Sequence, residues 1–307
     1  MSPTDPARSP RREFLKAAVA IPAALAAARL SGAEPPAEAT AMPHLQIGKH
    51  SISRLVCGAN PFNAGSHLSV FVNREMRSYF TPEQILTTLR RCEAAGINTW
   101  QSSRDGHLDL YRRYLDASGK MQFLAIETNQ PETIKKLAQG GCIGIAHHGE
   151  ATDSLFKAGR LDQVNECLKR IRDAGLLVGV STHMPDVVDA IESKGWDLDY
   201  YMTCVYQRHR SEAELQKLLG HVPLPVGEVY LKSDPPRMFR AMRQTKRPCL
   251  AFKILAAGRL SDRREWVEQA FRDTFSSIKP GDGVIVGIYD RYSDQAAEDA
   301  ALVRRFG

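Results

Sequence analysis

The sequence predicts an α/β fold, a closed (β/α)8 (TIM) barrel with eight parallel strands inside a ring of helices. After residue 42, strand-like and helix-like runs alternate eight times over roughly 250 residues, which is the size and order of such a barrel. No linker-like change in composition divides residues 43–307, so we expect one domain there. The 307-residue chain is 43% hydrophobic and 25% charged, which suffices for one large core. A doubly wound sheet is the alternative for such alternation.

Two short runs of alternating apolar and polar residues flank Gly48 and Lys49, which predicts a hairpin at residues 44–53, ahead of the barrel. Thr81 and Pro82 predict a helix start, because Thr caps helices and Pro suits the first helical position. The predicted barrel strands are residues 55–59, 97–101, 121–127, 142–147, 176–181, 198–205, 249–255 and 283–287. The predicted helices are residues 81–95, 108–117, 131–138, 161–174, 185–193, 212–219, 236–243, 263–277 and 294–305.

Residues 1–33 resemble a cleavable twin-arginine signal peptide. The string RREFLK at residues 11–16 precedes an Ala-rich stretch that is too short and too weakly apolar for a stable membrane span. Ser31, Gly32 and Ala33 are small residues suited to cleavage. Residues 34–42 then read as a flexible N-terminus of the mature protein. We therefore expect export to the periplasm, or otherwise out of the cytoplasm, by the twin-arginine (Tat) translocase.

Charge and cysteine usage exclude some other classes. The formal net charge is +6, but residues 1–33 carry five basic and two acidic side chains, so half of it lies in the leader. The remaining basic residues are mixed with acidic ones, which predicts no nucleic-acid-binding patch. The six cysteines lack CxxC spacing and lie mostly in apolar strand-like runs, so we expect buried free thiols instead of disulfides.

Ionisable side chains gather at the predicted carboxyl ends of the strands, where barrel enzymes carry their chemistry. Glu127 ends the third strand, His147 and His148 end the fourth, His183 follows the fifth and Lys253 belongs to the seventh. Each alone has a structural explanation as a paired or solvated group, but together they predict a catalytic site. Because side chains alternate along a strand, at most one of His147 and His148 faces a cavity.

Several strings resemble the aldo/keto reductases, over most of residues 44–305. They include LQIGKHSISRLVCGANPF at residues 45–62, VGVSTHMPDVV at 178–188, AFKILAAGRL at 251–260 and VIVGIYDRYSDQAAEDAALV at 284–303. The resemblance implies a barrel with an opening hairpin that reduces carbonyl compounds with NADPH. That family uses an Asp–Tyr–Lys–His set, with Tyr as the proton donor.

This sequence lacks most of the family's four catalytic residues, but it keeps more of the residues that bind the cofactor in that family. Gln101 or Ser102 replaces the Asp, no Tyr follows closely before Tyr111, Glu127 replaces the Lys, and only the His is retained, as His147. On the cofactor side, the resemblance implies that Ser181 holds the carboxamide and Phe252 stacks on the nicotinamide. It also implies that Gly287 and Glu298 lie near the adenosine and that Arg291 meets a 2′-phosphate.

Two enzymatic hypotheses follow. The first is an NADP-dependent oxidoreductase of a small carbonyl or sugar-type substrate, in which His147 or His148, with Lys253, moves the proton. The second is a lyase, isomerase or epimerase in which Glu127, His148 and His183 bind Zn, Mn, Fe or Co, since one carboxylate and two imidazoles suit these metals.

Two further readings remain. In the first, a buried Lys253 forms a Schiff base with the substrate, as in barrel aldolases. In the second, loss of the reductases' catalytic residues leaves an inactive barrel that only binds a ligand. The long predicted loops at residues 60–79 and 206–227 are polar and cationic. Because such loops cover the ligand in barrel enzymes, we expect a polar or sugar-like small-molecule substrate.

Overall fold

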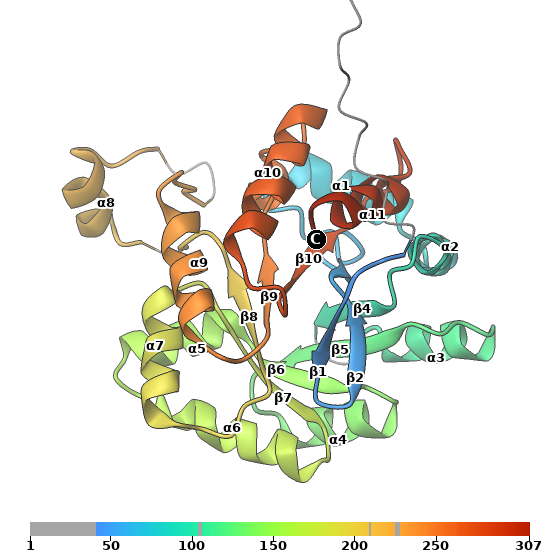
Figure 1. Cartoon of the computed structure of the whole chain (residues 1–307), viewed down its shortest axis with the longest axis horizontal. Helices are drawn as coiled ribbons and strands as arrows, with labels where there is room; N and C mark the ends of the chain where they lie inside the picture. Colours follow the sequence, from blue (N-terminus) through green and yellow to red (C-terminus); the bar gives the residue numbers. More distant parts are fainter. Residues whose placement is uncertain (1–40, 104–105, 209, 225–227) are drawn as a thin grey trace, which may run out of the picture. The chain divides into compact units, whose positions relative to one another are not determined.

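The computed structural model describes residues 41–103, 106–208, 210–224 and 228–307. Eight parallel strands close into a barrel in the order β10-β3-β4-β5-β6-β7-β8-β9, which confirms the predicted fold class (Figure 1). The strands are β3 (Leu55–Gly58), β4 (Thr99–Ser103), β5 (Gln122–Glu127), β6 (Gly144–His147), β7 (Leu177–Thr182), β8 (Tyr200–Cys204), β9 (Cys249–Phe252) and β10 (Gly283–Gly287).

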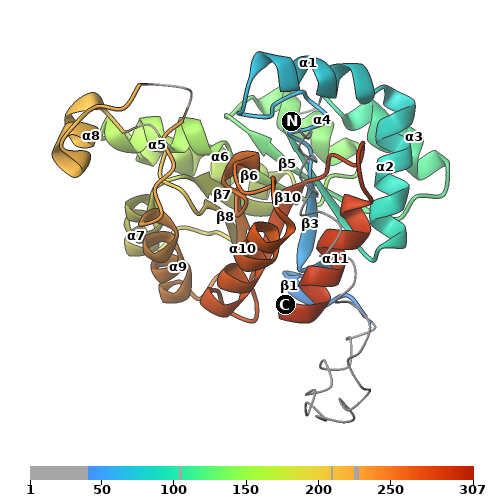
Figure 2. The same cartoon turned by 90° about the horizontal axis from the view of Figure 1, so that it is seen from above.

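Helices follow the strands and surround the barrel (Figures 1 and 2). They are α1 (Val70–Tyr79), α2 (Pro82–Ala94), α3 (Leu108–Asp116), α4 (Pro131–Gln139), α5 (Gly149–Lys157), α6 (Asp162–Asp173), α7 (Pro185–Lys194), α8 (Glu212–Leu219), α9 (Asp234–Gln244), the 3-10 turn η2 (Ala256–Gly258), α10 (Arg264–Ser277) and α11 (Gln295–Phe306). The predicted start of α2 is confirmed, since the Thr81 side chain accepts from Gln84 N and Pro82 is the first helical residue.

The predicted hairpin closes the amino end of the barrel. Its strands, β1 (His44–Ile47) and β2 (His50–Ser53), pair antiparallel. Leu45, Ile47 and Ile52 are buried with the inward-facing side chains of the barrel strands. Gly283, the first residue of β10, leaves room for this contact, because a Cβ there would lie 2.6 Å from Leu45 Cδ2. The opposite, carboxyl end of the barrel is therefore the one that stays open to a ligand.

Three parts of the structure differ from the prediction. Residues 60–79, expected as a loop, contain α1, and α5 follows β6 directly although no helix was expected there. The seventh barrel strand ends at Phe252 and not at residue 255, because Lys253 has φ 60° and turns the chain out of the sheet. Ala256 and Ala257 also have positive φ, at 48° and 52°.

All six cysteines are free and buried, as predicted. Within the described ranges, no helix has the length and apolar character needed to span a membrane. The predicted signal peptide and nearly all of the segment at residues 34–42 lie outside the described residues.

Candidate active site

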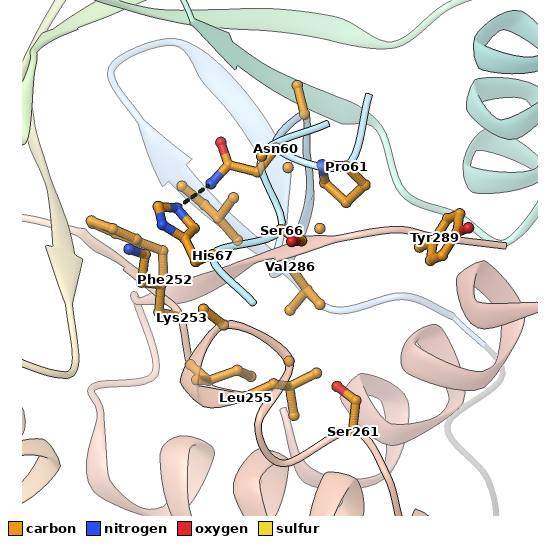
Figure 3. A pocket seen from close by; sticks show the side chains of 18 of the residues that line it. Asn60, Pro61, Ser66, His67, Phe252, Lys253, Leu255, Ser261, Val286 and Tyr289 are labelled. Carbon is orange, nitrogen blue, oxygen red and sulfur yellow. Dashed lines mark hydrogen bonds between the residues drawn. The ribbon is translucent and has the colours of Figure 1, made fainter. Parts of the chain in front are cut away.

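A cavity of about 800 Å³ opens at the carboxyl ends of the barrel strands. This volume lies in the upper part of the usual range for small-molecule sites. The strands contribute Gln101, Ser181, Phe252 and Gly287, and the cavity continues to side chains of α10 and α11. Figure 3 shows His67, Phe252 and Lys253 at one end of the view and Ser261 and Tyr289 away from them. The cavity is thus an elongated site that joins the barrel mouth to the last two helices.

Strand alternation decides which predicted residues reach this cavity. On β7, Ser181 and His183 line it, whereas Thr182 points outward and donates to Asp153. After β6, His148 lines the cavity and His147 does not. His148, His183 and Lys253 therefore line the same cavity.

Glu127 and His147 lie on the outer face of the barrel, so the prediction that they act on the substrate is corrected. The two residues are register partners on β5 and β6. Glu127 Oε1 accepts from Thr128 N at 2.6 Å, and Nδ1 of His147 is 2.7 Å from Thr152 Oγ1. Burial lowers the pKa of His147 to about 4, with His148 adding to the shift. His147 is thus a neutral, internally bonded imidazole.

The predicted metal ligands Glu127, His148 and His183 are not gathered around one point. Glu127 faces the helices, and Nδ1 of His183 is committed to a hydrogen bond with Asp153. In the part of the chain that the structure describes, no group of three His, Cys, Asp or Glu side chains is arranged to hold a metal ion. The geometry gives the metal hypothesis no support.

Asp153, which the sequence did not single out, and Arg208, a cation of the predicted loop at residues 206–227, hold His183 from both sides. His183 Nδ1 donates to Asp153 Oδ2 at 2.8 Å, and Arg208 Nη1 donates to His183 Nε2 at 3.3 Å. Since the guanidinium can only donate, Nε2 carries no proton and Nδ1 does. Burial lowers the pKa of His183 although Asp153 opposes this shift. His183 is therefore neutral at pH 7, in one fixed tautomer.

Glu228 is a second residue that sequence reasoning missed, and it connects three loops. Its carboxylate is 3.1 Å from His67 Nδ1 and 3.5 Å from Lys253 Nζ, and it also pairs with Arg208. Tyr230 donates its hydroxyl to the same carboxylate. Burial acts to raise the pKa of Glu228, but the hydrogen bonds from His67 and Tyr230 and the charge of Lys253 outweigh it and hold the pKa below its usual range. Glu228 is thus ionised at neutral pH.

Lys253 combines burial with a turned backbone. Its side chain is only 7% exposed and lines the cavity. Because φ is positive at Lys253, the side chains of Phe252 and Lys253 both face the cavity, although consecutive residues of a regular strand face opposite sides. Burial lowers the pKa of Lys253 from its ordinary value, and Glu228 partly offsets the shift. An ammonium in this position is a better proton donor than one in water.

Four of the five residues expected on the cofactor side line the cavity, namely Ser181, Phe252, Gly287 and Glu298. The fifth, Arg291, does not, so its expected role is corrected. Its Nε lies 3.6 Å from Glu75 Oε1, and its guanidinium lies over the ring of Tyr79. An arginine that does line the cavity is Arg264, at the start of α10. Among the described residues, no side chain caps the N-terminus of this helix.

Asp299 adds a buried carboxyl to the α11 side of the cavity. Its side chain follows Glu298 and lines the same wall. Burial raises the pKa of Asp299 to about 7, and the charge of Glu298 adds to the shift. Near neutral pH, this carboxyl is thus present in both its protonated and its ionised form.

The phenol that the family has after its second barrel strand is not at the cavity. The tyrosine among the described lining residues is Tyr289, which follows β10 and lies away from Lys253 (Figure 3). Tyr111 is buried against the ring of Phe123, with centroids 4.8 Å apart. Tyr230 donates to Glu228 and does not line the cavity. Gln101 lines it where the family has its Asp, while Ser102 faces outward and bonds His107. A proton donor beside Phe252 therefore has to come from other residue types.

Solved structures with the same fold are enzymes of several kinds. A protein from Pseudomonas aeruginosa described as an aldo-keto reductase has a TM-score of 0.55 at 13% identity, over 85% of this chain and 94% of that chain. An aldo-keto reductase from Bacillus halodurans, in its holo form, has a TM-score of 0.51 at 12% identity, over 84% and 90%. A truncated 3-deoxy-D-arabino-heptulosonate 7-phosphate synthase from Thermotoga maritima has 0.51 at 11%, over 85% and 90%.

These identities establish similarity of fold between this chain and barrel enzymes, aldo-keto reductases among them. No protein-family model matches the chain, and no curated protein matches its sequence. Function has to be argued from the cavity itself, because one barrel fold supports many chemistries.

Proposed function

We propose that this chain is an exported, NADP-dependent oxidoreductase that acts on a small polar carbonyl compound or the corresponding alcohol. One observation carries the proposal. A single cavity of about 800 Å³ contains Ser181 and Phe252 at the barrel mouth and Glu298 on α11, so its volume and lining suit a dinucleotide. The similarity in fold to aldo-keto reductases supports the same reading.

The side chains along the cavity fit the parts of such a cofactor. Phe252 offers an aromatic face and Ser181 a hydroxyl at the barrel mouth, while Glu298 and Asp299 offer acceptors for an amino group at the other end. Between them, Arg264 lies at the uncapped N-terminus of α10, where unpaired N–H groups and the helix dipole favour phosphate. When bound, the nicotinamide supplies or accepts the hydride.

Lys253 is the proton donor in this proposal. Its ammonium lines the cavity beside Phe252, and burial makes it more acidic than a lysine in water. Glu228 holds it in place through the contact at 3.5 Å. In the reducing direction, Lys253 Nζ donates a proton to the carbonyl oxygen as that oxygen becomes a hydroxyl. His183, neutral and fixed by Asp153, positions Arg208 beside it.

The test is titration of the purified protein with NADPH and NADH, followed by nucleotide fluorescence. We expect NADPH to bind, and Arg264→Gln to weaken NADPH by about tenfold or more while changing NADH much less, since a charge contact is lost. Arg291→Gln is the matched control and is expected to leave both affinities unchanged. Binding of neither nucleotide would overturn the proposal.

Export rests on the twin-arginine pattern at residues 11–16. With both arginines replaced by lysines, we expect the full-length precursor to remain in the cytoplasm of a host with a Tat translocase. Immunoblotting of cell fractions measures this outcome. Equal amounts of processed protein in the periplasm with and without the replacement would contradict it.

A further inference from the structure

Two cations line the cavity mouth and share one carboxylate. Arg208 and Lys253 come from the segments after β8 and β9, and both contact Glu228. Glu228 itself is not part of the cavity lining, whereas the two cations and His67 are. Glu228 therefore lies behind them and gathers three separate loops around the cavity end shown with His67 and Lys253 in Figure 3.

At this end, two cations share one directly contacting carboxylate. Among the described residues, Glu228 contacts both Arg208 and Lys253, whereas Asp153 reaches Arg208 only through the neutral ring of His183. The side chains of Arg208 and Lys253 are only 11% and 7% exposed. Glu150 also lines the cavity, but it is exposed at the start of α5, where water screens its charge. Buried charge without a partner is costly, so a bound anion would stabilise this arrangement.

Lys253 also has unused hydrogen-bonding capacity. An ammonium offers three donors, and among the described residues its one hydrogen-bond partner is Glu228 Oε2, at a long 3.5 Å. Its side chain is more than nine-tenths buried and lines the cavity. The remaining donors thus face the space that a ligand would occupy.

We propose that Arg208 and Lys253 form an anion subsite, and that the substrate is a small oxo- or hydroxy-acid whose carboxylate binds there. Because Glu228 and Asp153 already supply negative charge nearby, a monoanionic carboxylate fits here better than a dianionic phosphate. The identity of the substrate as a redox partner rests on the proposed function, whereas carboxylate binding does not. Phe252 is adjacent to Lys253 in the chain, so the bound acid lies next to the ring expected to face the nicotinamide.

The experiment compares lactate with lactamide, which differ only in the charged group, by calorimetric titration of the purified protein at low salt without nucleotide. We expect lactate to bind at least about tenfold more tightly than lactamide. Arg208→Gln and Lys253→Gln should each remove that preference. Lys246→Gln, an exposed cation before β9 at the opposite end of the barrel, is the matched control and should keep it.

Equal affinity for lactate and lactamide, or a lactate preference that survives Arg208→Gln, overturns the subsite. If the two cation variants do not fold, Glu228→Gln decides, because it keeps the shape and leaves both cations without their carboxylate. Lactate affinity should then rise by about threefold or more, and an unchanged or lower affinity in the folded variant overturns the subsite. NADPH binding without lactate preference would reject only the subsite, whereas lactate preference without NADPH binding would reject only the redox function.

Discussion

At the scale of single residues, the site is made of groups whose protonation is set by burial. Lys253 is held in a left-handed conformation that non-glycine residues adopt at a cost of roughly 1–2 kcal/mol. The surrounding contacts with Glu228 and the cavity wall have to outweigh this cost. Strain of this kind is common where a protein aims a side chain at a ligand. The left-handed conformation of Lys253 explains why its side chain and that of Phe252 face the same cavity although the two residues are neighbours in the chain.

Asp299 makes stability depend on pH. Its pKa rises from 3.8 in the unfolded chain to about 7 in the fold, mainly through burial. The folded state therefore binds a proton that the unfolded state releases, so stability is highest below this window and falls as pH rises through it. Asp299→Asn removes the titration. Without nucleotide, we expect the variant to be more stable than the original protein by roughly 1–3 kcal/mol near pH 8 and about equal near pH 4.

Denaturant unfolding at several pH values measures this difference. Glu298→Gln is the comparison variant. Glu298 is exposed, and because its charge only adds to the effect of burial, its loss should change the pH dependence much less than Asp299→Asn does. The same stability difference for Asp299→Asn at both ends of the pH range would contradict the assignment of the shift to Asp299.

Asp153 opposes the fall that burial causes in the pKa of His183, and Asp153→Asn removes its charge. The amide oxygen can still accept from His183 N and Nδ1, so the tautomer should stay the same. We expect the pKa of His183 to fall further, which NMR titration of the imidazole measures. Stability should fall by roughly 1–3 kcal/mol, because hydrogen bonds to a buried carboxylate become neutral ones. An unchanged pKa in the folded variant would show that Asp153 does not act on His183.

At the scale of helices and strands, α1 forms one wall of the cavity through Val72 and Met76. Its N-cap is Ser69, whose side chain accepts from Val72 N at 3.2 Å. Ser69→Ala should destabilise this helix by about 1 kcal/mol. Hydrogen exchange of the α1 amides should then quicken by about fivefold, and NADPH should bind more weakly.

Ser211→Ala provides the matched control for that experiment. Ser211 caps α8 in the same way, within a capping box, but α8 stands away from the barrel in Figures 1 and 2 and contributes nothing to the cavity lining. We expect faster exchange in α8 and unchanged NADPH affinity. An equal loss of NADPH affinity in both variants would contradict a role of α1 in holding the nucleotide.

The order of the barrel elements could be predicted from the sequence, because apolar strands and capped helices each leave a local pattern. The helix α5 could not, since it begins at Gly149 directly after β6, and glycine and threonine are poor helix formers. Missing α5 meant missing Asp153 as the partner of His183. The outward direction of Glu127 and His147 depends on strand register, and a shift by one residue reverses the side that each faces. Glu228 lies in an irregular segment, where no local sequence pattern indicates that its side chain reaches the cavity residues.

At the scale of the whole molecule, the two ends of the barrel have different tasks. The hairpin fills the amino end with apolar side chains, and the carboxyl end carries the ionisable ones. Changes at one end should therefore leave the other intact, as in other barrels where the lower face serves stability. This separation allows loops at the open end to vary without loss of the core.

Ile47→Ala tests that separation. Ile47 is fully buried among the barrel's inward-facing side chains, so truncation should cost about 2–5 kcal/mol of unfolding free energy. NADPH affinity of the folded variant should not change. Gln46→Ala, on the exposed face of the same strand, is the control and should affect neither quantity. A loss of nucleotide affinity with Ile47→Ala would show that the two ends are coupled.

The pairing of β3 with β10 has a consequence for synthesis of the protein. Leu55 is the register partner of Val284, so the first barrel strand to leave the ribosome has to wait for the last one before the sheet can close. Until then, the apolar side chains of the hairpin have no enclosed interior to enter. The earliest part of the domain to be made is thus the last to be buried, and a truncated nascent chain presents it to chaperones throughout translation.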